Sequence, residues 1–274
     1  VRMVKGKTVD LMIPADAELI IEGKVDTELL EPEGPFGESH GHIALEDFNM
    51  SMTVTAITHK SNAIMPSIIS QVTPSEASVI KRVAYEPMYL NHLRNNLSLK
   101  CVKKVSLHEP LTNIRKVLFV QLEKGTSRTE VWRALNGASM LRADSGKYVI
   151  AIDQDIDPDN ADSVFWALAY RANPIEDMQI LPHRARGHGP KAKDGPSEDS
   201  TLLIDATMKG DMPPLALPKK EYMEHAKEIW ERLQLPTLTP QSPWHGYEMG
   251  HWSDDWEDGA VRAVQGFYHL NGEN

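Results

Sequence analysis

Two glutamates flank a short turn near the start of the chain. The segment EPEGPFGESHGH, residues 31–42, sets Glu33 and Glu38 five positions apart around the turn Gly-Pro-Phe-Gly. Glycine and proline give such a turn a defined backbone, and Phe36 adds an apolar wall. A carboxyl group beside an apolar wall and a second carboxylate is favoured in its protonated form, the form that a general acid needs. The residues alone leave two interpretations open, a solvated acidic turn and an acid–base pair.

Two other segments have ligand-like spacing. His40 and His42 would face the same side of a strand, as paired metal ligands do, but without a third ligand ordinary polar histidines are favoured. DQDIDPDNADS, residues 153–163, begins like a calcium loop. However, Pro158 stands where that loop needs glycine and Val164 where it needs a bidentate glutamate, so a capped strand-to-helix turn is expected.

The remaining reactive groups favour structural roles. Cys101 lies in a predicted strand and is expected to be a small core residue. RGHGPK, residues 186–191, has an arginine and glycines that suit an anion, yet no phosphate-loop or dinucleotide pattern surrounds it, so a flexible loop is favoured. There is no G-x-S-x-G motif, so the sequence gives no support to a serine hydrolase.

Composition narrows the classes of partner. The chain has 274 residues, 41% of them hydrophobic, which is enough for a substantial core. Its formal charge of -10 disfavours nucleic acid and anionic membranes, so a small molecule or another protein is expected. A single cysteine excludes a disulfide framework, and the sequence has neither a long apolar run nor a signal peptide. A cytoplasmic protein is therefore expected.

The elements that must position these residues fall into two patterns. The first 65 residues predict short strands, at 8–13, 18–22 and 50–57, the last of them half-buried because polar and apolar residues alternate. From residue 74 the pattern changes to that of an α/β layer domain. It predicts a helix with a kink or break near Pro87, strands at 99–107 and 115–122, and a helix at 127–141 opened by a capping box. A strand at 147–153, a helix at 162–170, a loop at 183–200 and an amphipathic helix at 218–233 follow.

Four motifs, in order, resemble one known family. PADAELIIEG at 14–23, EGPFGESHG at 33–41, NAIMP at 62–66 and DIDPDNADSVFWALAYR at 155–171 resemble the UbiD family of decarboxylases, which includes ferulic acid decarboxylase. The resemblance implies an enzyme that uses prenylated flavin mononucleotide. It implies that the unsaturated bond of an aromatic or α,β-unsaturated acid adds to the modified flavin and that CO2 then leaves. Glu33 and Glu38 would join an arginine over the flavin, with Glu38 delivering the replacing proton.

The resemblance also implies binding roles for a few further residues. Arg171 would lie near the potassium site beside the flavin phosphate. Four residues would line the substrate pocket, although for the last two plain core packing is an equal alternative: Phe36, Ser39, Ile180 and Leu181. Manganese, potassium and the flavin are implied as cofactors, but the family's catalytic arginine and its Asn, His and Glu ligands for manganese precede the matching stretch.

The implied organisation is α+β. Residues 1–66 would be the C-terminal portion of a split β-barrel that carries EGPFGE, residues 67–215 the family's α/β C-terminal domain, and residues 216–274 an amphipathic helix and a docking tail with Trp244, Trp252 and Trp256. An interrupted barrel predicts a complementary N-terminal segment or subunit, and the family's C-terminal domain implies a homo-oligomer.

Two rival functions stay open. The first is a non-catalytic oligomerisation or regulatory subunit, against which the presence of both glutamates in their turn argues. The second is a carboxylase, since the same groups would serve both directions.

Overall fold

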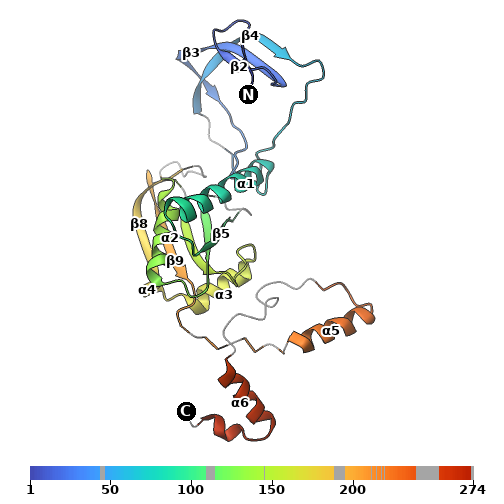
Figure 1. Cartoon of the computed structure of the whole chain (residues 1–274). Helices are drawn as coiled ribbons and strands as arrows, with labels where there is room; N and C mark the ends of the chain where they lie inside the picture. The colour runs from blue at the N-terminus through green and yellow to red at the C-terminus, as the bar shows by residue number, and fades with distance from the viewer. Residues whose placement is uncertain are drawn as a thin grey trace. The chain divides into compact units, whose positions relative to one another are not determined.

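The computed structural model describes residues 1–43, 47–108, 115–144, 146–187, 195–210, 212–213, 215–216, 218, 220–238 and 253–272, without the side chains of residues 47, 220 and 272. These residues form a mixed α+β chain (Figure 1). In chain order the elements are β1 Met3–Lys5, β2 Met12–Pro14, β3 Leu19–Glu33, β4 Asp47–His59, α1 Glu76–Asn91, a π-helical turn His92–Asn96, β5 Val102–Leu107, β6 Val117–Leu122, α2 Arg128–Met140, β7 Tyr148–Asp153, α3 Ala161–Arg171, α4 Pro174–Asp177, β8 Met178–Ala185, β9 Glu198–Ala206, α5 Lys220–Arg232, α6 Asp254–Val264 and a 3-10 turn Tyr268–Gly272.

The described residues belong to two compact units. The first consists mainly of residues 1–81, and the second begins at Arg82. The division falls inside α1, later in the chain than the boundary at residue 66 expected from the sequence. None of the described helices is long and apolar enough to cross a lipid bilayer.

A long antiparallel hairpin of β3 and β4 dominates the first unit. Its ladder contains a bulge between the pairs Val25–Met52 and Leu30–Met50, where β3 advances five residues while β4 advances two. Asp26 shapes the bulge, because its Oδ1 accepts the backbone N–H groups two and three residues later, at 2.9 and 3.2 Å. The bulge therefore sets which residues face each other at the end of the hairpin, beside the acidic turn.

The apolar side chains of this hairpin are exposed. The sequence predicted a half-buried strand at 50–57, and the strand is present, but no described layer covers its apolar residues. The sheet has only the two strands β3 and β4, so it contributes little core of its own. The exposed apolar residues of the hairpin are Ile21, Val25, Leu29, Leu30, Phe48, Met50, Met52, Val54 and Ile57.

The strand expected at 8–13 is present only at its end, since residues 8–11 are not part of a strand. Residues 7–9 instead form a loop around the carboxylate of Glu22, which accepts the backbone N–H groups of Lys7 at 2.8 Å, Thr8 at 2.6 Å and Val9 at 3.1 Å. These bonds, with that of the Thr8 hydroxyl, lower the pKa of Glu22 to about 2. A buried carboxylate thus takes the donors that a strand ladder would have used, and β2 begins only at Met12.

The second unit is built on a five-stranded sheet in the order β5-β6-β7-β9-β8. β6, β7 and β9 run parallel, while β5 and β8 are antiparallel edge strands. Alternate residues of the central strands enter two separate apolar clusters, one packed against α1 and α2 and the other against α3. The strands are therefore buried on both faces, as parallel strands are, and the helices lie on either side of the sheet (Figure 1).

The sequence anticipated most of this unit but missed two strands. Ser127 Oγ accepts the Glu130 N–H at the start of α2, as the capping box predicted. The helix predicted to kink or break near Pro87 is not broken there and continues to Asn91. β8 and β9 were missed, and only the end of β8 and the start of β9 fall within the loop predicted at 183–200. In the sheet, β9 joins β7 to β8.

Candidate active-site turn

Close packing fixes the shape of the turn between the two glutamates. Glu33 ends β3, and Gly34 follows with a φ of 103°, a conformation that side chains disfavour. A Cβ on Gly37 would lie 2.6 Å from the carbonyl oxygen of Ser70 and 2.8 Å from the side chain of Gln71. Glycine is therefore required at position 37, since the segment after the NAIMP motif lies directly against the turn.

Glu38 sits at the start of a tight hydrogen-bonded loop. Its N–H donates to the His42 carbonyl at 3.0 Å, and its carbonyl accepts the Gly41 N–H at 2.9 Å. The next residue, Ser39, is buried and accepts a hydrogen bond from the Lys81 ammonium at 2.7 Å. Helix α1 thus holds this loop through Lys81, a residue that the sequence gave no reason to single out.

The two glutamates have different surroundings. The carboxylate of Glu33 accepts a hydrogen bond from Asn49 Nδ2 at 2.8 Å. Glu38 is half-buried, and no residue in the described part of the chain donates to its carboxylate. The geometry therefore gives the Glu33 carboxylate a fixed hydrogen-bond donor and leaves the Glu38 carboxylate without one among the described residues.

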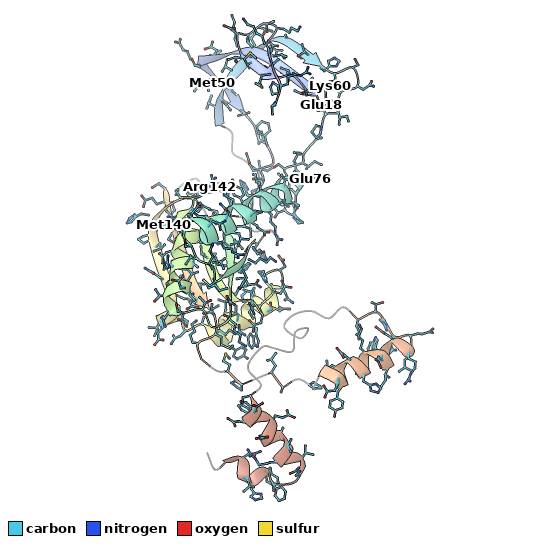
Figure 2. All side chains as sticks on the ribbon, in the orientation of Figure 1. Glu18, Met50, Lys60, Glu76, Met140 and Arg142 are labelled. Atoms are coloured by element: carbon cyan, nitrogen blue, oxygen red, sulfur yellow. The ribbon has the colours of Figure 1, made fainter. Side chains whose placement is uncertain are left out.

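A surface hollow of about 320 Å³ lies beside Glu33. Phe36, predicted as an apolar wall, lines it together with Glu33, and Glu38 is not among its lining residues. The residues that line the hollow are acidic, apolar or uncharged polar: Glu31, Pro32, Glu33, Gly34, Phe36, Asn49, Met50 and Ser51. Met50 marks this end of the hairpin in Figure 2, and the ion pair of Glu18 and Lys60, 2.6 Å long, marks the other end.

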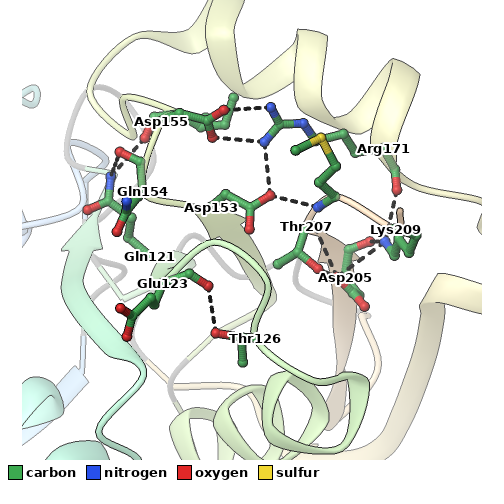
Figure 3. Close-up of polar contacts among 12 residues, drawn as sticks. Gln121, Glu123, Thr126, Asp153, Gln154, Asp155, Arg171, Asp205, Thr207 and Lys209 are labelled. Atoms are coloured by element: carbon green, nitrogen blue, oxygen red, sulfur yellow. Dashed lines mark hydrogen bonds and ion pairs between the residues drawn. The ribbon is translucent and has the colours of Figure 1, made fainter. Parts of the chain in front are cut away.

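Arg171, predicted to bind near the flavin phosphate, is buried in a carboxylate network of the second unit (Figure 3). Its guanidinium donates to Asp153 at 2.9 Å and to both oxygens of Asp155 at 2.9 and 2.7 Å. It also lies over the ring of Trp166, 5.1 Å from the centroid. These contacts account for Arg171 as a structural residue, and its role toward a cofactor stays a prediction.

Asp153 is the member of this network whose ionised form is most disfavoured by burial. Burial raises its pKa to about 6, although the Met208 N–H and Arg171 oppose the rise, while Asp155 and Asp205 add to it. Arg171 offsets only part of the cost of removing this carboxylate from water. The network ties the chain leaving β9 to the ends of the parallel strands, because Lys209 also donates to the Arg171 carbonyl at 2.8 Å.

The two pocket residues predicted from β8 point to different environments. Leu181 packs against the core of the second unit, as the core-packing alternative expected. Ile180 is 68% exposed and so is not a core residue. Their role in a substrate pocket stays a prediction.

The other ligand-like segments have structural contacts. His40 Nδ1 accepts the His42 N–H at 3.2 Å, and their ring centroids are 5.6 Å apart. Asn160 caps α3 by accepting the N–H groups of Asp162 and Ser163, which confirms the capped turn. Within the described ranges, no three His, Cys, Asp or Glu side chains gather as a metal-binding group. Residues 188–191, Trp244 and Trp252 lie outside the described part of the chain.

Two protein-family models match the chain. The 3-octaprenyl-4-hydroxybenzoate carboxy-lyase Rift-related domain (UbiD) matches residues 1–72, and the C-terminal domain of the same carboxy-lyase matches residues 78–206. Uncharacterized proteins of Archaeoglobus fulgidus and Aquifex aeolicus are 29% identical over 212 residues and 30% identical over 246 residues. These alignments cover 76% and 85% of this chain but only 42% and 49% of the relatives, so the chain spans less than half of their length.

Solved structures show the same likeness. The UbiD-class enzyme HmfF from Pelotomaculum thermopropionicum, in complex with FMN, matches with a TM-score of 0.66 and 26% identity, covering 82% of this chain and 50% of that chain. An evolved dimeric form of that enzyme in complex with prFMN matches with a TM-score of 0.64 and 27% identity, covering 82% and 48%. Vanillic acid decarboxylase of Sedimentibacter hydroxybenzoicus, 21% identical with a TM-score of 0.63 and covering 84% and 50%, shares the fold.

Proposed function

Because the chain belongs to the UbiD family of carboxy-lyases, we propose that it is part of a prenylated-FMN-dependent enzyme that removes CO2 from, or adds it to, an aromatic or α,β-unsaturated acid. The observation that carries the proposal is the packed turn that holds Glu33 and Glu38 at its two ends. HmfF, which this chain resembles, has been solved with FMN and with prFMN.

The hollow beside Glu33 fits part of such a cofactor. Phe36 and Met50 offer apolar atoms to a flat ring, and Glu33 offers an acid group. No cationic side chain lines the hollow to hold a phosphate, and the described residues provide no manganese ligand set. The phosphate would therefore be held by groups other than those that line the hollow, and no step is assigned to Mn²⁺ or K⁺.

Prenylated FMN, when bound, would supply the electron sink for the charge that CO2 leaves behind. In this chain, Glu38 is the group assigned to move the proton. A general acid must release its proton to carbon and then regain one, which suits a half-buried carboxyl without a fixed donor among the described residues. Glu33, held by Asn49, would supply the neighbouring fixed charge. In carboxylation the same two groups would act in reverse.

A complementary UbiD-like segment or subunit is part of the proposal. The hairpin exposes apolar side chains that an additional layer packed on it would bury, and a two-stranded sheet is only marginally stable without such cover. We expect the isolated 274-residue chain to bind the flavin weakly and not to turn over. Robust decarboxylation by the isolated chain would contradict this expectation.

The alternative is a scaffold subunit without chemistry. Replacing Glu38 separates the two in the enzyme reconstituted with the segment that completes the barrel. Glu38→Gln keeps the size of the side chain and removes its acid, so turnover should fall by about 100-fold or more. A Glu28→Gln variant, altered in the bulge of the same hairpin, serves as the control. Unaltered turnover in Glu38→Gln would support the scaffold.

A further inference from the structure

Asn49 lies beside Glu33 at the end of the hairpin. In the β3–β4 ladder Asn49 pairs with Glu31, and Glu33 is two residues further along the same face of β3. This places Asn49 diagonally across from Glu33, within reach of a short side chain, and both residues line the same hollow. The bulge shaped by Asp26 sets this register, so the meeting of the two residues depends on a feature of the hairpin itself.

Two hydrogen bonds fix the orientation of the Asn49 amide. Its Oδ1 accepts the N–H of Met50 at 2.9 Å, and its Nδ2 donates to Glu33 Oε2 at 2.8 Å. A flipped amide would set two donors against each other at Met50 and two acceptors against each other at Glu33. The backbone of β4 therefore directs the NH₂ group at the carboxylate.

This contact constrains only one of the two acids. A bond from an N–H donor to a carboxylate is stronger than one between neutral groups, and it restricts the rotation of the glutamate side chain. Oε1 of Glu33 has no donor among the described residues and stays available to a ligand.

We propose that Asn49 is a positioning residue for Glu33, which keeps that carboxylate at one place in the hollow as a fixed negative charge. This inference rests on the proposed function, because it concerns the same acid pair. In this assignment Asn49 holds the Glu33 carboxylate in place, and Glu38 transfers the proton.

The contact itself is tested without any cofactor. In the 274-residue chain labelled with ¹⁵N, the side-chain NH₂ resonances of Asn49 should move in Glu33→Gln and stay in place in the matched variant Glu38→Gln. Resonances that do not respond to Glu33→Gln would overturn the contact, whatever the function of the protein.

The consequence is tested in the reconstituted enzyme. Asn49→Asp keeps the acceptor for the Met50 N–H and sets a carboxylate against Glu33, so kcat should fall by about tenfold with KM little changed. Asn49→Gln, which restores an amide donor, should recover part of the loss. In a Glu33→Gln background, Asn49→Asp should cost nothing more, because Asn49 acts through Glu33.

Three results would separate the possible failures. If Glu33→Gln alone reduces turnover, two results would overturn the role of Asn49. These are a wild-type kcat in Asn49→Asp, and a full additional loss of kcat when Asn49→Asp is added to Glu33→Gln. Wild-type turnover in Glu33→Gln would instead overturn the proposed function of Glu33, and with it the inference built on that function.

Discussion

At the scale of single residues, the surroundings of each carboxylate determine its use. Glu22 is held by backbone N–H groups and Asp153 by an arginine, and both are buried within their own units. Glu33 and Glu38 differ from them, since they flank a turn at the surface of the first unit and hold few bonds. Of these four acids, the two at the turn have the fewest structural contacts, which supports their assignment to chemistry.

Asp153 predicts a pH dependence of stability. Its pKa rises from 3.8 unfolded to about 6 folded through burial, so the folded state binds more protons than the unfolded state between these values. Its contribution to stability is complete below pH 4 and is lost as the pH rises through 6. Arg171, Asp155, Asp205 and the Met208 N–H face it from the surrounding elements.

Asp153→Asn removes this titration. Wild type should lose stability relative to Asp153→Asn by roughly 2 kcal/mol between pH 4 and pH 7, even if the variant is less stable throughout because Arg171 loses a partner. Urea unfolding at a series of pH values measures the difference. A constant difference across this range would contradict the assignment.

At the scale of elements, a buried carboxylate replaces a strand ladder in the first unit. The pKa of Glu22 is lowered to about 2, and the hydrogen bond from the Lys7 N–H is the largest cause. The stability that this carboxylate contributes is therefore present above its unfolded pKa of 4.5 and is lost as the pH falls toward 2. In Glu22→Gln the amides of residues 7–9 should lose, already at neutral pH, the protection from exchange that wild type loses only in acid. Unchanged exchange in Glu22→Gln, relative to a Glu28→Gln control, would refute this role.

Local patterns predicted elements whose signal lies in their own residues. The alternation at 50–57 and the cap at Ser127 each specify an element through nearby side chains, and both elements are present. The loop at residues 7–9 could not be read in this way, because its donors are taken by Glu22, more than ten residues away. β8 and β9 flank a Gly-, Pro- and Lys-rich stretch that resembles a loop, and their pairing with β7 is a tertiary property.

The candidate site divides in the same way. The residues of the EGPFGE turn were evident from the sequence, because glycine, proline and two acids are local signals. Asn49 and Lys81 were not, since each reaches the turn through a register or a helix packing that no local pattern encodes. A search for polar residues on the strand facing Glu33 would have found Asn49 once the bulge was known.

At the scale of the whole molecule, the exposed face of the hairpin predicts where a complementary segment docks. Val25 is 51% exposed, and Thr53 lies in the pair beside it, on the opposite face of the ladder. Val25→Lys should leave the isolated chain folded, because exposed positions tolerate such changes, and should abolish reconstitution with the complementary segment. Co-purification measures this effect, with Thr53→Lys as the matched control. Normal assembly of Val25→Lys would show that this face is not the docking surface.

The central claim, that Glu38 carries the proton to and from carbon, is tested most directly by solvent exchange. The reconstituted enzyme is incubated with the decarboxylated product in D₂O, and deuterium is followed at the carbon that carried CO2. The wild-type enzyme should exchange that hydrogen for deuterium whether its physiological reaction is carboxylation or decarboxylation. Glu38→Gln should lose this exchange while still binding the cofactor. Exchange by Glu38→Gln at the wild-type rate would contradict the account.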